Sequence, residues 1–206
     1  MLTLYTMPRT CALASQIALE EAGADYIKVR VDFKKDEQRQ PAYLAVNPKG
    51  RVPALVTERG ILTENPAILA FIAQSFPAAK LAPLDDPFGF AQAQSFNAYI
   101  ASTVHVAHAH GPRGSRWADD PAAIAEMKRV MPRTVAACFD LIETQMLKGP
   151  WVLGDAYSIC DAYLFTVAQW IEGDGVDPAL FPKVIDHRRR VSERPAVKRA
   201  LADETA

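Results

Sequence analysis

Cysteine is scarce in this chain: only Cys11, Cys138 and Cys160 occur among its 206 residues. An odd number of cysteines at wide spacing does not make the disulfide framework that small secreted domains use. Residues 1–5 also lack the basic leader and the small-residue cleavage site of a secretory signal. We therefore expect thiols rather than disulfides, and a cytoplasmic location.

A long apolar run and an excess of charge of either sign are also missing. No apolar stretch reaches the length that crosses a membrane. Lys and Arg number 23 against 24 Asp and Glu, which gives a formal net charge of −1. The dense basic run at 187–190 lies in a helical pattern and is interpreted as a solvated helix face. Neither a membrane nor a nucleic acid is an expected partner.

The first third of the chain changes its hydrophobic period several times. Residues 11–22 repeat apolar side chains at three-to-four spacing, and Gly23 stands where such a helix ends. Asn65 and Pro66 suit the N-cap and the first position of a later helix. The predicted order is strand, helix, strand, short helix, strand, strand and helix, over 2–6, 11–22, 26–31, 43–46, 52–56, 61–62 and 65–75.

The rest of the chain is helical by period and follows a proline-marked linker over residues 77–87. The pattern therefore predicts an N-terminal α/β domain over residues 1–76. It predicts an all-helical C-terminal domain over residues 88–206. The helices expected in this second domain cover 88–110, 121–147, 159–172, 182–193 and 196–203.

Four segments of the sequence resemble glutathione transferases, most closely the bacterial beta class. They follow one another in the order and at the spacing of that family, over nearly the whole chain. The segments are 5–14 (YTMPRTCALA), 47–55 (NPKGRVPAL), 63–68 (TENPAI) and 158–165 (SICDAYLF). The resemblance implies a thioredoxin-like fold for the N-terminal domain, glutathione as co-substrate, no metal, and a homodimer.

Cys11 follows a predicted strand and turn and stands at the start of a predicted helix. Unpaired N–H groups and the positive end of the helix dipole favour a thiolate there, and a thiolate is the better nucleophile. From position alone, a small buried cysteine is the alternative. The resemblance implies that Cys11 contacts the glutathione sulfur and can form a mixed disulfide with it. Thr10 is an alternative hydroxyl donor to that sulfur, and Tyr5 is interpreted as core.

The segment around Pro53 is expected to hold the cysteinyl part of glutathione. The resemblance implies a cis bond between Val52 and Pro53, which re-aims the preceding backbone. The N–H and C=O groups of Val52 would then pair with the tripeptide like an added strand. Arg51 belongs to the same binding set. From the residues alone, an ordinary turn proline is the alternative.

The two charged ends of glutathione are assigned to other residues. Glu64 would pair with the γ-glutamyl amine, and the N–H of Asn65 at a helix N-terminus would hold the carboxylate beside it. The family more often has Ser where Asn65 stands, and a plain helix cap is the other interpretation of this residue. Lys35, or its neighbour Lys34, is expected near the glycine carboxylate.

His105 stands on the first long helix of the second domain, where the resemblance implies a histidine that faces the sulfur and the second substrate. The class also has an asparagine early in this helix, and Ala98 fills that position here. A metal site is disfavoured because no cysteine or carboxylate completes a ligand set with the histidines. The second substrate is expected in a cleft between the domains, near Met7, Arg9, His105, His108 and Trp117.

Ser158 and Asp161 have the spacing of a capping box, in which a cap hydroxyl and a third-position carboxylate exchange bonds with backbone N–H groups. This pair is expected to be structural rather than catalytic. Tyr163, Phe165 and Trp170 are interpreted as core rather than as a substrate wall.

The expected activity is that of a glutathione transferase, which activates the glutathione thiol for attack on a soft hydrophobic electrophile. A glutathione-dependent thiol–disulfide reductase, peroxidase or dehalogenase is one alternative, because Cys11 suits disulfide exchange. A non-catalytic binding or regulatory protein is an alternative of another class, which the retained Cys11, Glu64 and Pro53 disfavour. The fold does not identify the electrophile.

Overall fold

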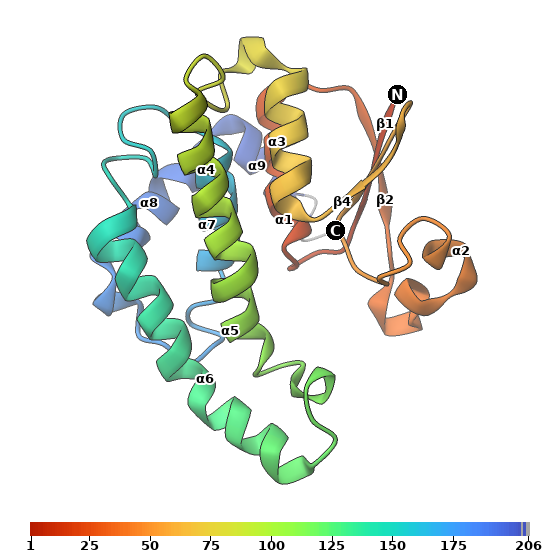
Figure 1. Cartoon of the computed structure of the whole chain (residues 1–206), viewed down its shortest axis with the longest axis vertical. Helices are drawn as coiled ribbons and strands as arrows, with labels where there is room; N and C mark the ends of the chain where they lie inside the picture. The colour runs from red at the N-terminus through yellow and green to blue at the C-terminus, as the bar shows by residue number, and fades with distance from the viewer. Residues whose placement is uncertain (203, 205–206) are drawn as a thin grey trace. The chain divides into compact units, whose positions relative to one another are not determined.

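The computed structural model describes residues 1–202 and 204, and these form two compact units. Unit 1 contains residues 1–94 and the described residues from 192 onward, and unit 2 contains residues 95–191. The domain boundaries expected from the sequence stay predictions. Figure 1 shows the course of the chain through both units.

Unit 1 has α/β architecture, and the order of its elements confirms the thioredoxin-like order that the sequence predicts. Helix α2 begins at Pro41, before the predicted 43–46, because proline is favoured in the first turn of a helix. The elements are β1 (Leu2–Thr6), α1 (Ala12–Ala22), β2 (Tyr26–Arg30), α2 (Pro41–Leu44), β3 (Ala54–Thr57), β4 (Gly60–Thr63), α3 (Asn65–Ser75) and α9 (Pro195–Ala202), with 3₁₀ turns at Phe33–Lys35, Glu37–Arg39 and Pro77–Ala79.

A four-stranded mixed sheet forms the centre of unit 1, in the order β2-β1-β3-β4. β1 runs parallel to β2 and antiparallel to β3, and β3 pairs antiparallel with β4. Because a parallel pair needs a crossover connection, α1 joins β1 to β2. In the register of β1 and β3, Leu4 lies opposite Leu55, and both side chains are fully buried.

Helix α1 packs against α3 and α9 within unit 1, and Figure 1 shows α1 and α3 lying next to each other. Leu13 and Ile17 are buried, as the apolar spacing predicts, and Leu19, Ser15 and Gln16 are buried as well. Gly23 ends the helix with φ 63°, in the left-handed conformation that glycine adopts without steric cost. The helix start is therefore fixed in place, and Cys11 comes directly before it.

Unit 2 is entirely helical, and α4 (Pro87–Tyr99) carries the chain into it from unit 1. The predicted helix 88–110 forms one continuous helical stretch, in which a π-helical turn at Ile100–Val104 lies between α4 and the next helix. A second π turn, Ile142–Met146, ends the predicted helix 121–147. The helices are α5 (His105–Ala109), α6 (Pro121–Leu141), α7 (Ile159–Ala168) and α8 (Pro182–Ser192), with 3₁₀ turns at Gly114–Arg116 and Pro178–Leu180.

Helix α7 forms the core of unit 2, and every residue in it is buried. A helix that is apolar on all sides must be enclosed by others, which is the position of α7. Tyr163 and Phe165 are among its fully buried side chains, so their interpretation as core is confirmed. Trp170 lies beyond the end of the helix and is only half-buried. No helix in the described part of the chain is long and apolar enough to cross a membrane.

The start of α8 is capped by a carboxylate from another element. Glu143 lies in the π turn after α6 and is buried. Its Oε1 accepts a hydrogen bond from the N–H of Lys183 at 3.0 Å, and its Oε2 accepts one from the N–H of Val184 at 2.9 Å. The carboxylate thus satisfies two N–H groups that the helix leaves unpaired, at its positive end.

Replacing Glu143 with alanine is expected to lower the free energy of unfolding by about 2–3 kcal/mol, because one buried and one part-buried N–H group lose a charged acceptor. Urea denaturation followed by circular dichroism measures the change. Asp140→Ala, at an exposed carboxylate near the end of α6, is the matched control and should unfold close to the parent. Equal midpoints for the two variants would contradict the capping role of Glu143.

Candidate functional site

The loop between β1 and α1 places Cys11 at the N-cap of α1, where its side chain is half-buried. Arg9 in this loop has φ 60°, which is uncommon for a residue with a side chain. The Thr10 hydroxyl accepts a hydrogen bond from the Ala12 N–H at 3.3 Å and donates one to Met7 O at 2.7 Å. Thr10 thus closes the loop, and its hydroxyl proton can reach a glutathione sulfur only if the bond to Met7 breaks.

The thiol of Cys11 meets the backbone before β3. Its Sγ lies 3.5 Å from Val52 O, although the two residues are far apart in sequence. The peptide bond between Val52 and Pro53 is cis, as predicted. The structure therefore brings together the predicted nucleophile and the backbone segment that was predicted to hold the cysteinyl part of glutathione.

The backbone just before Val52 is held by two buried side chains. Arg51 O accepts hydrogen bonds from the Tyr43 hydroxyl and from Asn47 Nδ2, each at 2.6 Å. Burial raises the pKa of Tyr43 to about 12, so the hydroxyl stays a donor over the ordinary pH range. The Arg51 side chain itself is exposed. Tyr43 and Asn47 were not predicted to support the site: Tyr43 lies outside the four segments, and Asn47 begins the segment 47–55 but was given no role there.

The start of α3 differs from the prediction that Asn65 is its N-cap. Glu64 is the N-cap, and Asn65 is the first helical residue with a buried side chain. Asn65 Nδ2 donates to Cys11 O at 2.7 Å, and Asn65 Oδ1 accepts from the Ser15 hydroxyl at 2.6 Å. The amide is therefore engaged by α1 instead of capping its own helix, and only the backbone N–H of Asn65 remains for a ligand carboxylate.

Glu64 is exposed and has φ 71°, a backbone conformation that is rare for a non-glycine residue and clusters at functional sites. Its Oε1 lies 2.7 Å from Lys49 Nζ, and Lys49 also donates to the Thr63 hydroxyl at 2.6 Å. A carboxylate and an ammonium group thus form an ion pair at the N-terminus of α3. Lys49 was missed by the sequence analysis, because it occurs in a turn where a solvated lysine is the usual interpretation.

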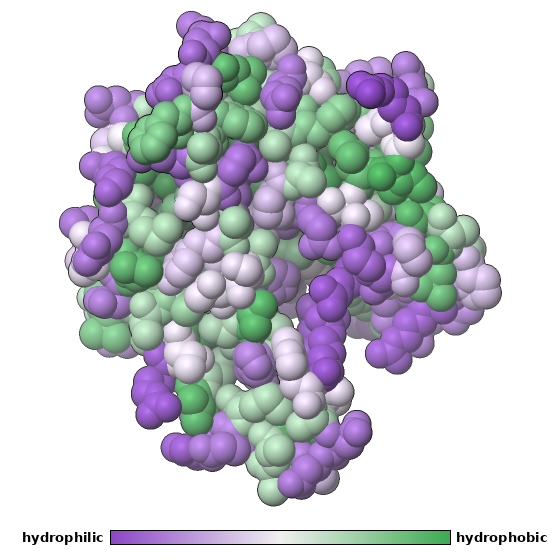
Figure 2. All heavy atoms as spheres, in the orientation of Figure 1, coloured by the Kyte–Doolittle hydropathy of each residue, from purple (hydrophilic) through white to green (hydrophobic). Residues whose placement is uncertain are grey.

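Lys34 and Lys35 are both exposed, in the 3₁₀ turn after β2. Lys35 Nζ lies 3.5 Å from Asp32 Oδ2, and the Lys34 N–H donates to Asp32 Oδ1 at 2.9 Å. This backbone hydrogen bond holds the pKa of Asp32 below its ordinary value. Figure 2 shows many hydrophilic side chains over the loops around α2, in the same part of unit 1. These contacts do not favour either lysine over the other as the residue that would bind the glycine carboxylate.

Met7 packs against the small apolar cluster of unit 1 that contains Ala12, Tyr43 and Val52, and Tyr5 does the same. The core interpretation of Tyr5 is therefore confirmed. Met7 was predicted to contact the second substrate, and its partial burial beside Val52 leaves that role as a prediction. Arg9 is exposed.

In unit 2, two histidines of α5 lie against Trp170. The His108 ring stacks on Trp170 with centroids 4.3 Å apart, and the His105 ring meets Trp170 edge-on at 5.2 Å. His108 Nδ1 lies 2.7 and 2.9 Å from the two carboxylate oxygens of Asp174. The sequence analysis missed Asp174, because nothing local to it indicates a partner on α5.

Two further residues of unit 2 that the sequence analysis named are Trp117 and Ala98. Trp117 is 47% exposed and stacks on His110 with centroids 4.4 Å apart. Ala98 is exposed, whereas its neighbour Asn97 is fully buried. Within the described residues, no group of three or more His, Cys, Asp or Glu side chains could hold a metal ion.

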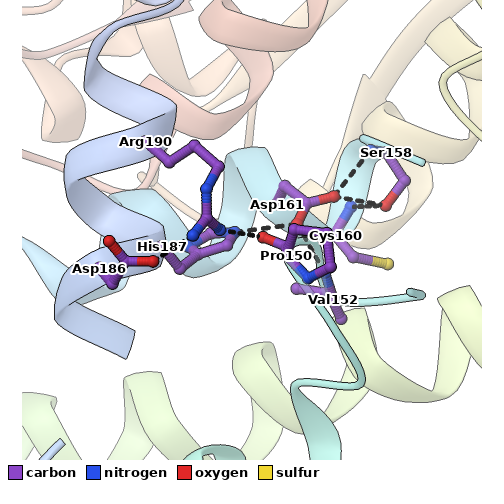
Figure 3. A network of polar contacts seen from close by, with 8 residues as sticks. All are labelled: Pro150, Val152, Ser158, Cys160, Asp161, Asp186, His187 and Arg190. Carbon is purple, nitrogen blue, oxygen red and sulfur yellow. Dashed lines mark hydrogen bonds and ion pairs between the residues drawn. The ribbon is translucent and has the colours of Figure 1, made fainter. Parts of the chain in front are cut away.

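The capping box predicted at the start of α7 is present and forms part of a larger network (Figure 3). Asp161 Oδ2 accepts from the N–H and the hydroxyl of Ser158, at 2.7 and 2.9 Å. The Ser158 hydroxyl in turn accepts from the Cys160 N–H at 3.2 Å. Asp161 Oδ1 accepts from the Val152 N–H at 2.7 Å and lies 2.9 Å from His187 Nε2. The pair therefore joins three segments of unit 2 and is structural.

The basic run at 187–190 is a solvated face only in part: Arg189 is exposed, whereas the other three side chains are buried or half-buried. His187 is fully buried against Asp161, and Arg188 pairs with Glu172 at 2.6 Å. Arg190 contacts Asp186 and the carbonyl of Pro150, as Figure 3 shows. Charge density in the sequence did not show that these side chains already have partners within the unit.

Comparison with known proteins identifies the family of both parts of the chain. Residues 1–74 match the family model described as the N-terminal domain of glutathione S-transferase, and residues 121–202 match the model of its C-terminal domain. The chain belongs to the glutathione S-transferase family, and the resemblance inferred from the four sequence segments is confirmed.

Individual relatives cover nearly the whole chain. Glutathione S-transferase GstA of Escherichia coli O157:H7 is 33% identical, over 98% of each chain. Maleylacetoacetate isomerase of Pseudomonas aeruginosa is 31% identical, over 96% of this chain and 92% of that one. A solved structure of a glutathione transferase homologue from Sulfitobacter, with bound glutathione, is 48% identical with a TM-score of 0.95, covering 100% of this chain and 98% of the other.

Proposed function

We propose that this protein is a glutathione transferase that activates the thiol of glutathione beside Cys11 for attack on a soft hydrophobic electrophile. The observation that supports this most strongly is the meeting of Cys11 Sγ with Val52 O next to the cis bond of Pro53. A cysteinyl residue that pairs with the backbone of Val52 would bring its own sulfur to the start of α1. There the positive end of the helix favours a thiolate.

The γ-glutamyl end of glutathione carries an amine and a carboxylate, and the start of α3 offers a matching pair of charges. Glu64 would take the amine, while the Asn65 N–H and Lys49 would take the carboxylate. The 2.7 Å pair between Lys49 and Glu64 would open to admit this end of the ligand. Lys35 or Lys34 would meet the glycine carboxylate at the opposite end of the tripeptide.

Once bound, the thiolate attacks the electrophilic carbon and forms a carbon–sulfur bond, while the bond from that carbon to the leaving group breaks and the leaving group takes the bonding electron pair. Orientation and stabilisation of the thiolate would supply most of the rate acceleration, because the chain needs no other chemistry for this step. Met7, Arg9, His105, His108 and Trp117 stay the proposed contacts of the second substrate. A cytoplasmic location and a homodimer accompany this proposal as expectations of the family.

Titration calorimetry with reduced glutathione tests the proposal directly. The wild-type protein should bind at millimolar ligand or below, and Glu64→Gln should weaken binding about tenfold or more, because a charge-assisted bond to the amine is lost. Glu58→Gln is the matched control, since Glu58 is an exposed carboxylate of the same unit that pairs with the chain's own N-terminus. Absence of heat and of thermal stabilisation in the wild-type protein would refute glutathione binding.

Thiol–disulfide exchange is the second candidate, favoured by the half-buried position of the Cys11 thiol at the N-cap of α1. In this reaction the Cys11 thiolate attacks the glutathione sulfur of a mixed disulfide, so that the substrate's own thiolate departs and Cys11 becomes glutathionylated. A glutathione thiolate then attacks this new disulfide, which releases oxidised glutathione and restores the Cys11 thiolate. Turnover of 1-chloro-2,4-dinitrobenzene against turnover of a mixed disulfide distinguishes the candidates. The isomerase among the relatives is a reason to include an unsaturated keto acid in the same panel.

A further inference from the structure

Helix α9 follows α8 in the chain, but it belongs to unit 1. It packs against α1 (Figure 1), and its side chains Ala196, Val197 and Ala200 are buried. Burial of these side chains removes apolar surface from water, so α9 is held in place as part of the core of unit 1. The helix that begins beside the Cys11 thiol therefore has α9 as a neighbour within the same unit.

Two arginines fasten the last part of the chain to α1. Arg194 donates to both carboxylate oxygens of Glu21, at 2.5 and 2.8 Å. Arg199 Nε donates to Glu20 Oε2 at 2.7 Å, and Arg199 Nη2 donates to Glu20 O at 3.2 Å. Paired contacts of this kind restrict direction as well as distance. They therefore determine where α9 lies along α1, and so where the chain goes after α9.

Beyond α9, the half-buried Glu204 contacts the loop that precedes Cys11. Its backbone N–H donates to Leu201 O at 3.0 Å, so its position follows from that of α9. Its Oε2 accepts a hydrogen bond from the N–H of Arg9, which is far away in the sequence. The acceptor is a carboxylate, and hydrogen bonds to charged acceptors are stronger than those between neutral groups.

The loop needs such support because of its backbone conformation. Arg9 has φ 60°, and a residue with a side chain keeps this conformation only where surrounding contacts hold it. The Thr10 hydroxyl provides local contacts, to Met7 O and the Ala12 N–H. The Glu204 carboxylate ties the same loop to another element of unit 1. Local and distant contacts thus act together on the segment that leads into Cys11.

We propose that Glu204 is a positioning residue, whose carboxylate holds the loop before Cys11 and thereby keeps the Cys11 thiol at the N-cap of α1. The inference rests on the proposed function, because it concerns sulfur chemistry beside Cys11, and it adds a residue outside the four sequence segments. Glu204 acts through the backbone of Arg9 and takes no part in the chemistry itself. A small displacement of a reacting group is enough to lower the rate of a reaction that depends on orientation.

Glu204→Ala tests the inference in steady-state assays with a glutathione mixed disulfide and with 1-chloro-2,4-dinitrobenzene. In whichever reaction the parent catalyses, the turnover number should fall about fivefold or more, because the thiol spends less time in the reactive position. The KM for glutathione should change less than about twofold, since the proposed binding groups at Val52 and Glu64 lie on other segments. A split between turnover number and KM distinguishes positioning from a general loss of binding.

Two further variants and a direct measurement of the contact complete the test. Glu204→Gln keeps an oxygen that can accept from the Arg9 N–H, so its turnover number should stay within about twofold of the parent. Hydrogen exchange followed by NMR should show the Arg9 amide exchanging about tenfold faster in Glu204→Ala than in the parent. Glu58→Ala removes another exposed carboxylate of unit 1 and should change neither quantity. Both alanine variants should unfold within about 2 °C of the parent.

The outcomes separate this inference from the function on which it rests. An active parent with an unchanged turnover number in Glu204→Ala would overturn the positioning role and leave the proposed function intact. An equal fall in Glu204→Ala and Glu204→Gln, or an Arg9 amide that exchanges at the parent's rate in Glu204→Ala, would likewise overturn it. A parent that converts neither substrate would overturn the proposed function, and this inference with it.

Discussion

Asp161→Ala is expected to lower the free energy of unfolding by about 3–5 kcal/mol, the largest stability effect of any change considered for this chain. The carboxylate is fully buried and satisfies donors from three residues: Ser158, Val152 and His187. Removing it leaves these donors buried without their acceptor. Since the net stability of most proteins is only about 5–15 kcal/mol, the variant should lose a large part of it.

Urea denaturation measures this loss, with fluorescence and circular dichroism recorded on the same samples. Asp177→Ala is the matched control, because Asp177 accepts a bond from the Ala179 N–H at 2.9 Å at the start of an exposed 3₁₀ turn. It should cost no more than about 1 kcal/mol, as exposed caps do. If the two variants unfolded at the same urea concentration, the network in Figure 3 would contribute nothing beyond an ordinary cap.

Cys11→Ala is expected to reduce glutathione-dependent thiol exchange about 100-fold or more, because the attacking sulfur is gone. Glutathione binding should fall less than about threefold, since the proposed main-chain contacts of Val52 and the charges around Glu64 remain. Stopped-flow assays with a mixed disulfide, together with calorimetry, measure the two quantities on one preparation.

Cys138→Ala is the control for this experiment. Burial raises the pKa of Cys138, and burial likewise raises the pKa of Cys160, so both stay protonated and unreactive at neutral pH. The Cys138 variant should keep its exchange activity. Equal activity in Cys11→Ala and its parent would remove Cys11 from the mechanism.

Local signals were sufficient to predict most of the fold. The spacing of apolar residues and Gly23 defined α1, and Ser158 with Asp161 marked the start of α7. The π turn at Ile100–Val104 left no such signal, because one extra residue per turn scarcely changes a short apolar pattern. The sequence therefore predicted a continuous helix over 88–110 correctly, but it did not indicate that its middle turn is π-helical.

The sequence predicted those site residues that occur in recognisable local segments. It did not predict contacts between residues that are far apart in the chain. Cys11 and Pro53 were found because each occurs in a recognisable segment. Asn65 was expected to cap its own helix, as asparagine does locally, but Ser15 and Cys11 O compete for its amide. The partnership of His108 with Asp174 brings together a residue of α5 and a residue that follows α7 in the chain, which a single sequence does not encode in any local pattern.

The amide of Asn65 has a consequence for which peptides the proposed site can accept. It ties the start of α3 to the carbonyl of the residue that carries the thiol, at 2.7 Å. The start of α3, which is proposed to bind the γ-glutamyl end of the ligand, is thus held at a fixed distance from Cys11, beside which the ligand's sulfur is proposed to lie. A γ-linked glutamate spans this spacing with its longer main chain, whereas an α-linked glutamate in the same tripeptide would fall short and leave its sulfur out of register.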